Sequence, residues 1–316
     1  MLEAAPTLGR FFLFIEGMHA PLVHFDALRF TYGEDQIFEF GTASIAPGEI
    51  VVMVGPSGAG KSTLMRLLRG ELEPLSGSVS IDGAPVETRK KRLVLDEKKA
   101  GWVPQLDDLQ GMLAVEENIG HHILRLDEEE REHRIKSLME AMCLTAFAGQ
   151  TTKTLSGGQR QRVSIAKAMA GEPPVLLMDE SLAQLDLRTK SAILLDMKAM
   201  IKRSKSAALL VLHDPSDALL VADTLWVVRD GKLVQTGSPN AIISNPAHHE
   251  IAGLFDYINV VPLALEVPGP WREEHGVKWL YAHDLPVLDA EVLDRMETPS
   301  GPIIVYQYQS HRLLKK

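Results

Sequence analysis

A short apolar run, followed by a glycine-rich loop and an amphipathic segment, is the feature that most constrains the fold. Residues 50–54 read Ile-Val-Val-Met-Val and end at Gly55. An uninterrupted run of this length predicts a strand buried on both faces, as in a parallel sheet. The loop is followed by apolar residues spaced like one face of a helix, at Leu64, Met65, Leu67 and Leu68. The order strand, loop, helix therefore predicts an α/β fold.

The loop itself has the spacing of the phosphate-binding P-loop, which is a glycine, four residues and then Gly-Lys-Ser. It consists of Gly55, Pro56, Ser57, Gly58, Ala59, Gly60, Lys61, Ser62 and Thr63. Glycines let the backbone curl so that successive N–H groups face a phosphate, and the positive end of the following helix favours the same charge. We expect Lys61 to reach the β and γ phosphates and Ser62 to ligate Mg²⁺. An ordinary glycine-rich turn is the alternative that this spacing disfavours.

A second buried strand is predicted at residues 175–178, and it ends in Asp179-Glu180. In a sheet that carries a P-loop, a carboxylate at the end of a neighbouring strand is suited to hold magnesium, and the next one to deprotonate an attacking water. We therefore assign the metal to Asp179 and the general base to Glu180. Without the P-loop upstream, such a pair is more often a solvated turn or a helix start.

A third segment, residues 155–162, reads Leu-Ser-Gly-Gly-Gln-Arg-Gln-Arg and precedes another apolar-periodic helix. Ser156 offers a hydroxyl, and Gly157 and Gly158 permit close backbone approach at a helix N-terminus. The segment therefore predicts a second surface that can face a phosphate. A purely structural helix cap is the alternative.

Together these segments resemble the ATP-binding subunits of ABC transporters, over about residues 22–245. Residues 55–63 match the Walker A loop, 155–159 the signature and 175–179 the Walker B strand. The resemblance implies that Tyr32 stacks on adenine, Gln105 touches Mg²⁺ and the attacking water, and His213 contacts the γ-phosphate. It implies catalytic roles for Glu180, His213, Gln105 and Lys61. It implies metal binding by Ser62, Gln105 and Asp179. It implies contacts to a second subunit's nucleotide from Ser156, Gly157, Gly158 and Gln159, and it puts Asp186 at the D-loop position.

The resemblance also implies a fold, namely a P-loop NTPase core of the ABC ATPase type with an antiparallel β subdomain and an inserted α-helical subdomain. It divides the chain into an N-terminal extension (1–21), an ABC ATPase domain (22–245) and a small β-rich appendage (246–316). The helical subdomain is expected at about residues 106–154. An alternative natural start at Met18 would remove most of the extension.

The periodicity of the chain agrees with this division. Helical spacing is found at residues 115–124 and again at 127–148, where the acidic run predicts a solvated helix face. Beyond residue 245, prolines separate short apolar runs at 260–261, 277–281 and 302–308, which predict short strands.

Composition narrows the classes of function. The net charge of −9 is the wrong sign for coating nucleic acid, so no nucleic-acid partner is expected. The single cysteine, Cys143, agrees with a reducing compartment. No apolar run approaches the roughly 20 residues of a membrane-spanning helix.

The resemblance accordingly implies an ATP hydrolase that uses ATP and Mg²⁺ and pairs with a second ATP-binding subunit, as a homodimer. Its other partners would be transmembrane permease subunits and, indirectly, a solute-binding protein, at the cytoplasmic face of the inner or plasma membrane. Solute import is the expected function. The alternatives are the ATPase of an exporter or lipid-handling complex, or a soluble ABC ATPase outside transport. Ser181 stands where many importer subunits have Pro, and Ala183 and Gln184 depart from their Ser-Ala-Leu-Asp D-loop. Residues 110–112 also depart from many importers, so the subclass and the substrate stay open.

Overall fold

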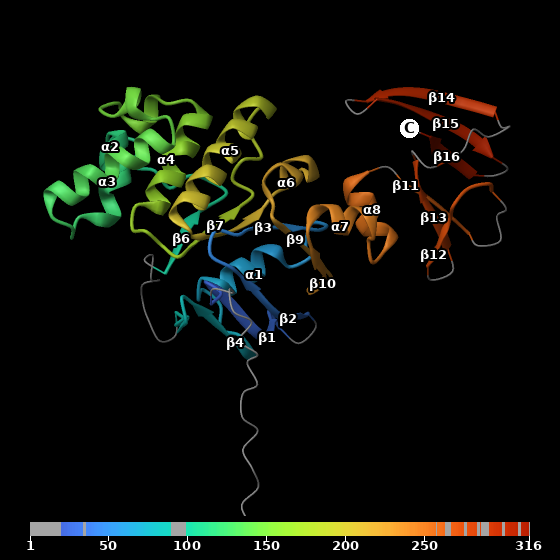
Figure 1. Cartoon of the computed structure of the whole chain (residues 1–316), viewed down its shortest axis with the longest axis horizontal. Coiled ribbons are helices and arrows are strands. Elements are labelled where there is room, and N and C mark those ends of the chain that lie inside the picture. Colours follow the sequence, from blue (N-terminus) through green and yellow to red (C-terminus); the bar gives the residue numbers. More distant parts are fainter. Residues whose placement is uncertain are drawn as a thin grey trace, which may run out of the picture.

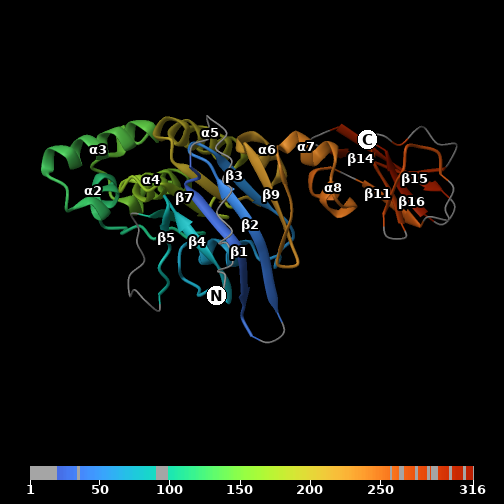
Figure 2. The same ribbon diagram turned by 60° about the horizontal axis from the view of Figure 1, so that its bottom comes forward.

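The computed structural model describes residues 20–33, 36–89, 99–256, 258–262, 267–274, 277–282, 285, 291–298, 301–308 and 311–315. Residues 1–19, which include Met18 and nearly all of the predicted extension, lie outside this part. The described chain forms a ten-stranded sheet with helices on both faces and two three-stranded sheets at one end of the molecule (Figures 1 and 2). None of its described helices is both long and apolar enough to cross a membrane. The α/β class is confirmed.

The large sheet joins a parallel half to an antiparallel half in the order β5-β4-β1-β2-β10-β9-β3-β8-β7-β6. Its parallel half contains β3 (Ile50–Val54), β6 (Ala100–Val103), β7 (Val175–Asp179), β8 (Ala207–Val211) and β9 (Thr224–Arg229). Its antiparallel half contains β1 (Val23–Thr31), β2 (Ile37–Ile45), β4 (Ser76–Ile81) and β5 (Ala84–Pro85). The strand β10 (Lys232–Gly237) joins the halves, antiparallel to β9 and parallel to β2.

Every residue of β3 is buried, as its apolar run predicts, and successive side chains face two separate cores. Val51 and Met53 pack with Leu64 and Leu68 of the helix α1 (Lys61–Leu68) on one face. The other face is covered by α4 (Gly157–Met169), α5 (Leu187–Ser204) and α6 (Pro215–Val221). The carboxyl ends of the parallel strands therefore lie between two helical layers, which is where open α/β sheets bind their ligands.

The inserted helical region is more broken than its periodicity predicts. A single α2 (Val115–Gly120) continues only as a 3₁₀ turn at His121–Ile123. The next helix, α3 (Glu128–Ala141), begins at the cap Asp127, whose carboxylate accepts from the Glu130 N–H at 2.9 Å. It ends well before residue 148 because Cys143 takes a left-handed φ of 55°. A 3₁₀ turn at Thr145–Phe147 follows.

Beyond β10, two short helices connect the large sheet to the C-terminal strands. They are α7 (Pro239–Ser244) and α8 (His249–Phe255). One sheet contains β11 (Ile258–Pro262), β12 (Arg272–Glu274) and β13 (Val277–Tyr281). The other contains β14 (Glu291–Thr298), β15 (Gly301–Tyr308) and β16 (His311–Lys315). The strands predicted at 260–261, 277–281 and 302–308 are confirmed.

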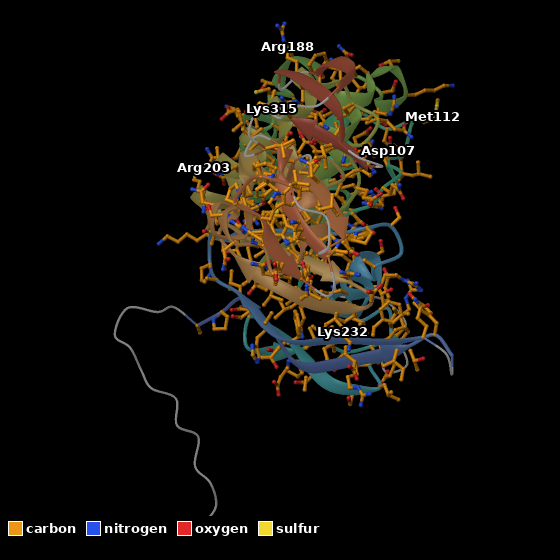
Figure 3. All side chains as sticks on the ribbon, turned by 90° about the vertical axis from the view of Figure 1, so that its right-hand side faces the viewer. Asp107, Met112, Arg188, Arg203, Lys232 and Lys315 are labelled. Atoms are coloured by element: carbon orange, nitrogen blue, oxygen red, sulfur yellow. The ribbon has the colours of Figure 1, made fainter. Side chains whose placement is uncertain are left out.

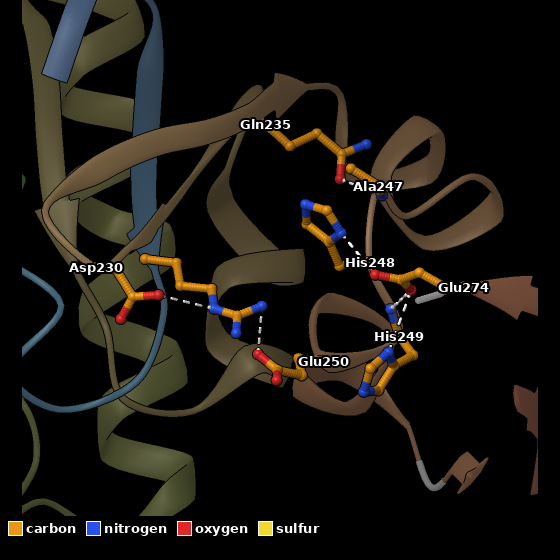
Figure 4. A network of polar contacts seen from close by, with 8 residues as sticks. Asp230, Gln235, Ala247, His248, His249, Glu250 and Glu274 are labelled. Atoms are coloured by element: carbon orange, nitrogen blue, oxygen red, sulfur yellow. Dashed lines mark hydrogen bonds and ion pairs between the residues drawn. The ribbon is translucent and has the colours of Figure 1, made fainter. Parts of the chain in front are cut away.

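The C-terminal strands are fastened to α7 and α8 by polar contacts (Figure 4). The carboxylate of Glu274 lies 2.7 Å from His248 Nδ1 and 3.1 Å from His249 Nδ1. It also accepts the His249 backbone N–H at 2.7 Å. The Tyr281 hydroxyl donates to the Ile243 carbonyl at 2.8 Å. In the same network Arg229, at the end of β9, pairs with Glu250 of α8 at 2.5 Å.

Candidate functional site

The predicted phosphate loop joins the end of β3 to the start of α1. Its lysine folds back on the loop, and Lys61 Nζ donates to the carbonyls of Gly55 at 2.8 Å and Pro56 at 2.9 Å. Burial lowers the pKa of Lys61, an effect that the nearby carboxylates of Glu180 and Asp179 oppose. A partly desolvated ammonium beside the N-terminus of a helix is suited to hold an anion.

Two of the loop glycines are fixed by their neighbours. Gly55 has φ +147°, and a Cβ there would lie 2.0 Å from the Val228 carbonyl oxygen of β9. Gly60 has φ +105°, and a Cβ there would meet the Phe38 ring at 2.8 Å. The turn after β9 touches the loop as well, because the Gly231 N–H donates to the Ala59 carbonyl at 2.9 Å. The loop therefore takes its curl from packing against β2, β9 and the turn between β9 and β10, as well as from its own glycines.

Asp179, at the end of β7, lies beside the first turn of α1. Burial raises the pKa of Asp179, while a hydrogen bond from the Ser62 side chain lowers it. Its Oδ1 atom is buried and has no hydrogen-bond partner. An unpartnered carboxylate oxygen next to a serine hydroxyl is a donor set that a hard divalent cation accepts. The structure thus brings together the predicted metal residues Ser62 and Asp179.

Glu180 and His213 follow neighbouring strands and line one cavity of about 150 Å³. The backbone of Glu180 has φ +47°, and its N–H donates to the Val211 carbonyl of β8 at 3.1 Å. The strand β8 ends at Val211, two residues before His213, which is exposed. The predicted base and the predicted phosphate sensor therefore share one space at the carboxyl ends of β7 and β8.

Tyr32 and Gln105 occupy the borders of this region. Tyr32 is 53% exposed, and its hydroxyl lies 3.3 Å from Thr63 Oγ1 and accepts from Arg66 at 3.1 Å. This arrangement places an accessible ring beside the first turns of α1. Gln105 is exposed and follows β6, whose Val103 pairs with Met178 of β7. Because β6 and β7 are parallel, Gln105 and Asp179 both lie at the carboxyl ends of the strands.

The segment at residues 155–159 forms the cap of α4. Ser156 Oγ accepts from the Gln159 backbone N–H at 3.3 Å, and Gln159 Oε1 accepts from the Ser156 N–H at 2.9 Å. This capping box is the structural alternative considered for the segment, but it uses the serine oxygen only as an acceptor. Within the described residues, no hydrogen bond or ion pair joins Ser156, Gly157 or Gly158 to the phosphate loop.

Asp186 caps the next helix, α5. Its carboxylate accepts the Thr189 N–H at 3.0 Å, and hydrogen bonds from Thr189 lower the pKa of Asp186. A Cβ at Gly158 would lie 2.5 Å from Thr189 Cγ2. The starts of α4 and α5 are therefore packed together, and Gly158 has a steric role as well as a proposed binding role.

Three residues that make buried polar contacts escaped the sequence reasoning. Asn118 is buried, and its amide donates to the carbonyls of Gln110, Leu113 and Ala114 at 3.1–3.2 Å. Lys190 and Asp217 form an ion pair that lines the cavity of Glu180 and His213. No motif marks these residues, because their contacts join segments that are distant in the chain or use only backbone partners.

Comparison with known proteins identifies the family. Residues 41–183 match the family model described as ABC transporter. The sulfate/thiosulfate import ATP-binding protein CysA of Gloeobacter violaceus is 35% identical over 260 residues, which is 80% of this chain and 73% of the relative. The sn-glycerol-3-phosphate import ATP-binding protein UgpC 1 of Rhizobium johnstonii is 34% identical over 70% of this chain and 60% of the relative.

Two solved structures are similar in fold. The protein cbiO1 of Clostridium perfringens, part of the ABC transporter complex cbiONQ, has a TM-score of 0.66 and 27% identity over 72% of this chain and 92% of that one. The ATP-binding cassette MJ0796, solved as a post-hydrolysis dimer with ADP and Pi, has a TM-score of 0.57 and 27% identity over 68% of this chain and 98% of that one. With the phosphate loop, the Asp179 site and the Glu180 cavity in place, the chain belongs to the ABC transporter family, as an ATP-binding and ATP-hydrolysing subunit of the import type.

Proposed function

We propose that two copies of this chain close head to tail over two ATP molecules, and that hydrolysis reopens them and drives solute import through separate membrane subunits. The observation that carries the proposal is the separation of two phosphate-ready helix starts within one chain. Lys61 begins α1 and Ser156 caps α4, with no described contact between them. A two-fold pairing brings the Ser156 surface of one copy onto the phosphate loop of the other.

In this proposal the loop at residues 55–60, Lys61 and Thr63 hold the triphosphate, and the exposed ring of Tyr32 stacks on adenine. Ser156 is able both to cap α4 and to contact phosphate. Its hydroxyl oxygen accepts the hydrogen bond of the cap, and its O–H group is still free to donate to a γ-phosphate oxygen. Gly157 and Gly158 bring backbone N–H groups to the same phosphate, and Gln159 holds the cap.

Magnesium would be held by Ser62, Asp179 and Gln105. The unpartnered, buried Oδ1 of Asp179 supports this site. The ion neutralises charge on the β and γ phosphates when bound. Glu180 takes a proton from the attacking water, and His213 contacts the γ-phosphate. Together with Gln105, His213 registers whether that phosphate is present.

Docking of the membrane subunits is supported by the helical region. An open cavity of about 730 Å³ is lined by the apolar residues Leu113, Leu124, Ile135 and Met139 among others. Met112 directly precedes Leu113 in the chain, is exposed and projects from the surface (Figure 3). Leu124, at the cavity, and Met112 are exposed apolar side chains, and exposed apolar surface marks a site of protein association. Such docking would hold the chain at the cytoplasmic face of the membrane, and a solute-binding protein would deliver solute to the membrane subunits.

The experiment that tests the proposal is Glu180→Gln. Without the base, ATP should stay bound, and size-exclusion chromatography with ATP and Mg²⁺ should show a stable dimer. Glu180→Gln/Lys61→Ala is the matched control, which should remain monomeric at an ATP concentration that saturates Glu180→Gln alone, because loss of Lys61 weakens ATP binding. A Glu180→Gln chain that stays monomeric at saturating ATP would contradict the proposal. Co-purification of the tagged chain with membrane proteins from its source cell tests the transport role.

A further inference from the structure

A largely buried ion pair lines the cavity that Glu180 and His213 also line. Lys190 Nζ is 2.5 Å from Asp217 Oδ2, and the two side chains are only 14% and 4% exposed. Both residues line the cavity. Lys190 lies in the first turn of α5 and Asp217 in the first turn of α6.

Each partner is tied through the backbone to the capping residue of its own loop. The Lys190 N–H donates to the Asp186 carbonyl at 2.9 Å, at the end of the loop that starts with Glu180. The Asp217 N–H donates to the Asp214 carbonyl at 3.2 Å. Asp214 directly follows His213. The ion pair is thus a side-chain link between the two loops that carry the proposed base and the proposed phosphate sensor.

Burial gives this link its rigidity. Two charges taken out of water hold each other in one geometry, and removal of one partner leaves the other charge uncompensated. A neighbouring tie is the backbone hydrogen bond from the Glu180 N–H to the Val211 carbonyl. Glu180 also has a positive φ, a conformation that persists only where the surroundings impose it.

We propose that Lys190 and Asp217 are positioning residues for ATP hydrolysis, which hold the loops of Glu180 and His213 at a fixed separation. The proposal rests on the functions proposed above for those two residues. A displacement of about 1 Å between reacting groups costs on the order of 100-fold in rate. The pair touches neither the phosphate loop nor Tyr32 through any described contact, so its loss should affect turnover and leave ATP affinity intact.

The test compares steady-state ATP hydrolysis by the full chain and by Asp217→Asn and Lys190→Met. We expect kcat to fall roughly 10-fold to 100-fold in each, with KM for ATP within about twofold of the original value. Lys190→Arg should restore most of kcat, because it keeps the charge. Lys202→Met is the matched control. Lys202 lies farther along α5 and forms a 2.6 Å ion pair with Asp223, so its replacement should leave kcat unchanged.

A second variant covers the case in which single substitutions unfold the chain. Replacement of a buried ion pair by apolar residues is often neutral for stability, so Lys190→Met/Asp217→Leu should fold. Full kcat in this folded double variant would overturn the proposal. So would an unchanged kcat in folded single variants that only lower the melting temperature, because that result identifies a purely structural pair.

A third measurement needs no turnover and therefore separates this proposal from the proposed function. The ring signal of His213 can be followed by NMR at one fixed pH, with the signal assigned from a His213→Gln variant. Asp217→Asn and Lys190→Met should both change the chemical shift of this signal, because both residues line the cavity that contains His213. Lys202→Met should leave the signal in place. A signal that moves in neither Asp217→Asn nor Lys190→Met would refute the link, whatever Glu180→Gln shows about dimers.

Discussion

Gly55→Ala provides a direct test of how the phosphate loop is held. The added Cβ would lie 2.0 Å from the Val228 carbonyl oxygen and 3.1 Å from the carbonyl carbon, whereas ordinary contacts begin at 3.4 Å. Val228 lies near the end of β9, where it pairs with Leu233 of β10, and it is next to Val227, which pairs with Val54 of β3. Withdrawal of Val228 from the loop would disturb the pairing of β9 with both neighbouring strands. The loop and β9 must therefore separate by about 1 Å or more.

The energetic cost has two parts. The φ of +147° at Gly55 is one that alanine rarely adopts, and backbone strain of this kind costs about 1–3 kcal/mol. Overpacking against a fixed neighbour adds about 1–3 kcal/mol. Gly58 is the matched control, because it has φ +77° but open space around its Cβ position. Gly58→Ala should therefore cost only about 1–2 kcal/mol of left-handed strain.

Urea unfolding followed by circular dichroism measures the difference. We expect Gly55→Ala to lower the free energy of unfolding by about 2 kcal/mol or more beyond Gly58→Ala, with a similar dependence on urea. Equal midpoints for the two variants, or a larger loss in Gly58→Ala, would show that the contact with β9 does not hold the loop.

Three further predictions concern charged side chains. Lys61→Ala should weaken ATP binding at least about 10-fold, because charged hydrogen bonds to phosphate contribute about 1.5–3 kcal/mol each; titration with fluorescent ATP checks this, and unchanged affinity would contradict the assigned role. Burial raises the pKa of Asp179, so its contribution to stability is lost as pH rises through that raised pKa. The melting temperature of Asp179→Asn should therefore rise relative to that of the original chain as pH increases above 3.8. A difference in melting temperature that is the same at every pH would refute this. Glu274→Gln keeps a hydrogen-bond acceptor for His248 and His249 but loses the charge, so limited proteolysis should remove the C-terminal strands faster while the large sheet survives; an unchanged cleavage rate would show that the charge is not needed.

The parts of the fold that could be predicted are those whose signal is local. The run at residues 50–54 is apolar throughout because β3 is buried on both faces. The loop after it combines glycines at positive φ with a lysine that bonds within the loop. Asp179 could be placed as well, because parallel strands end on the same side of a sheet, although β8 lies between the strand of Asp179 and the strand that carries the loop. Motif spacing and sheet geometry together determine these positions.

Other features depend on contacts that no window of sequence contains. The helical period from residue 127 to 148 does not reveal that the backbone turns left-handed at Cys143. The pairing of Lys190 with Asp217 requires α5 and α6 to be side by side, and each residue alone has the character of a solvated charge. The interpretation of Ser156 as either a cap or a ligand could not be decided by pattern, because a serine at a helix start has the chemistry for both.

In the C-terminal region the strands could be predicted from the sequence, but their attachment to the rest of the chain could not. Their apolar runs predict strands, but the attachment to α7 and α8 uses polar groups from separate segments, with Glu274 meeting two histidines about 25 residues earlier. The next link in that network joins Glu250 of α8 to Arg229, and the turn that follows donates the Gly231 N–H to Ala59 of the phosphate loop. Packing of short strands against a stable core depends on such tertiary partners. The C-terminal strands are therefore linked to the large sheet through α8 and β9, by side chains whose local sequence carries no motif.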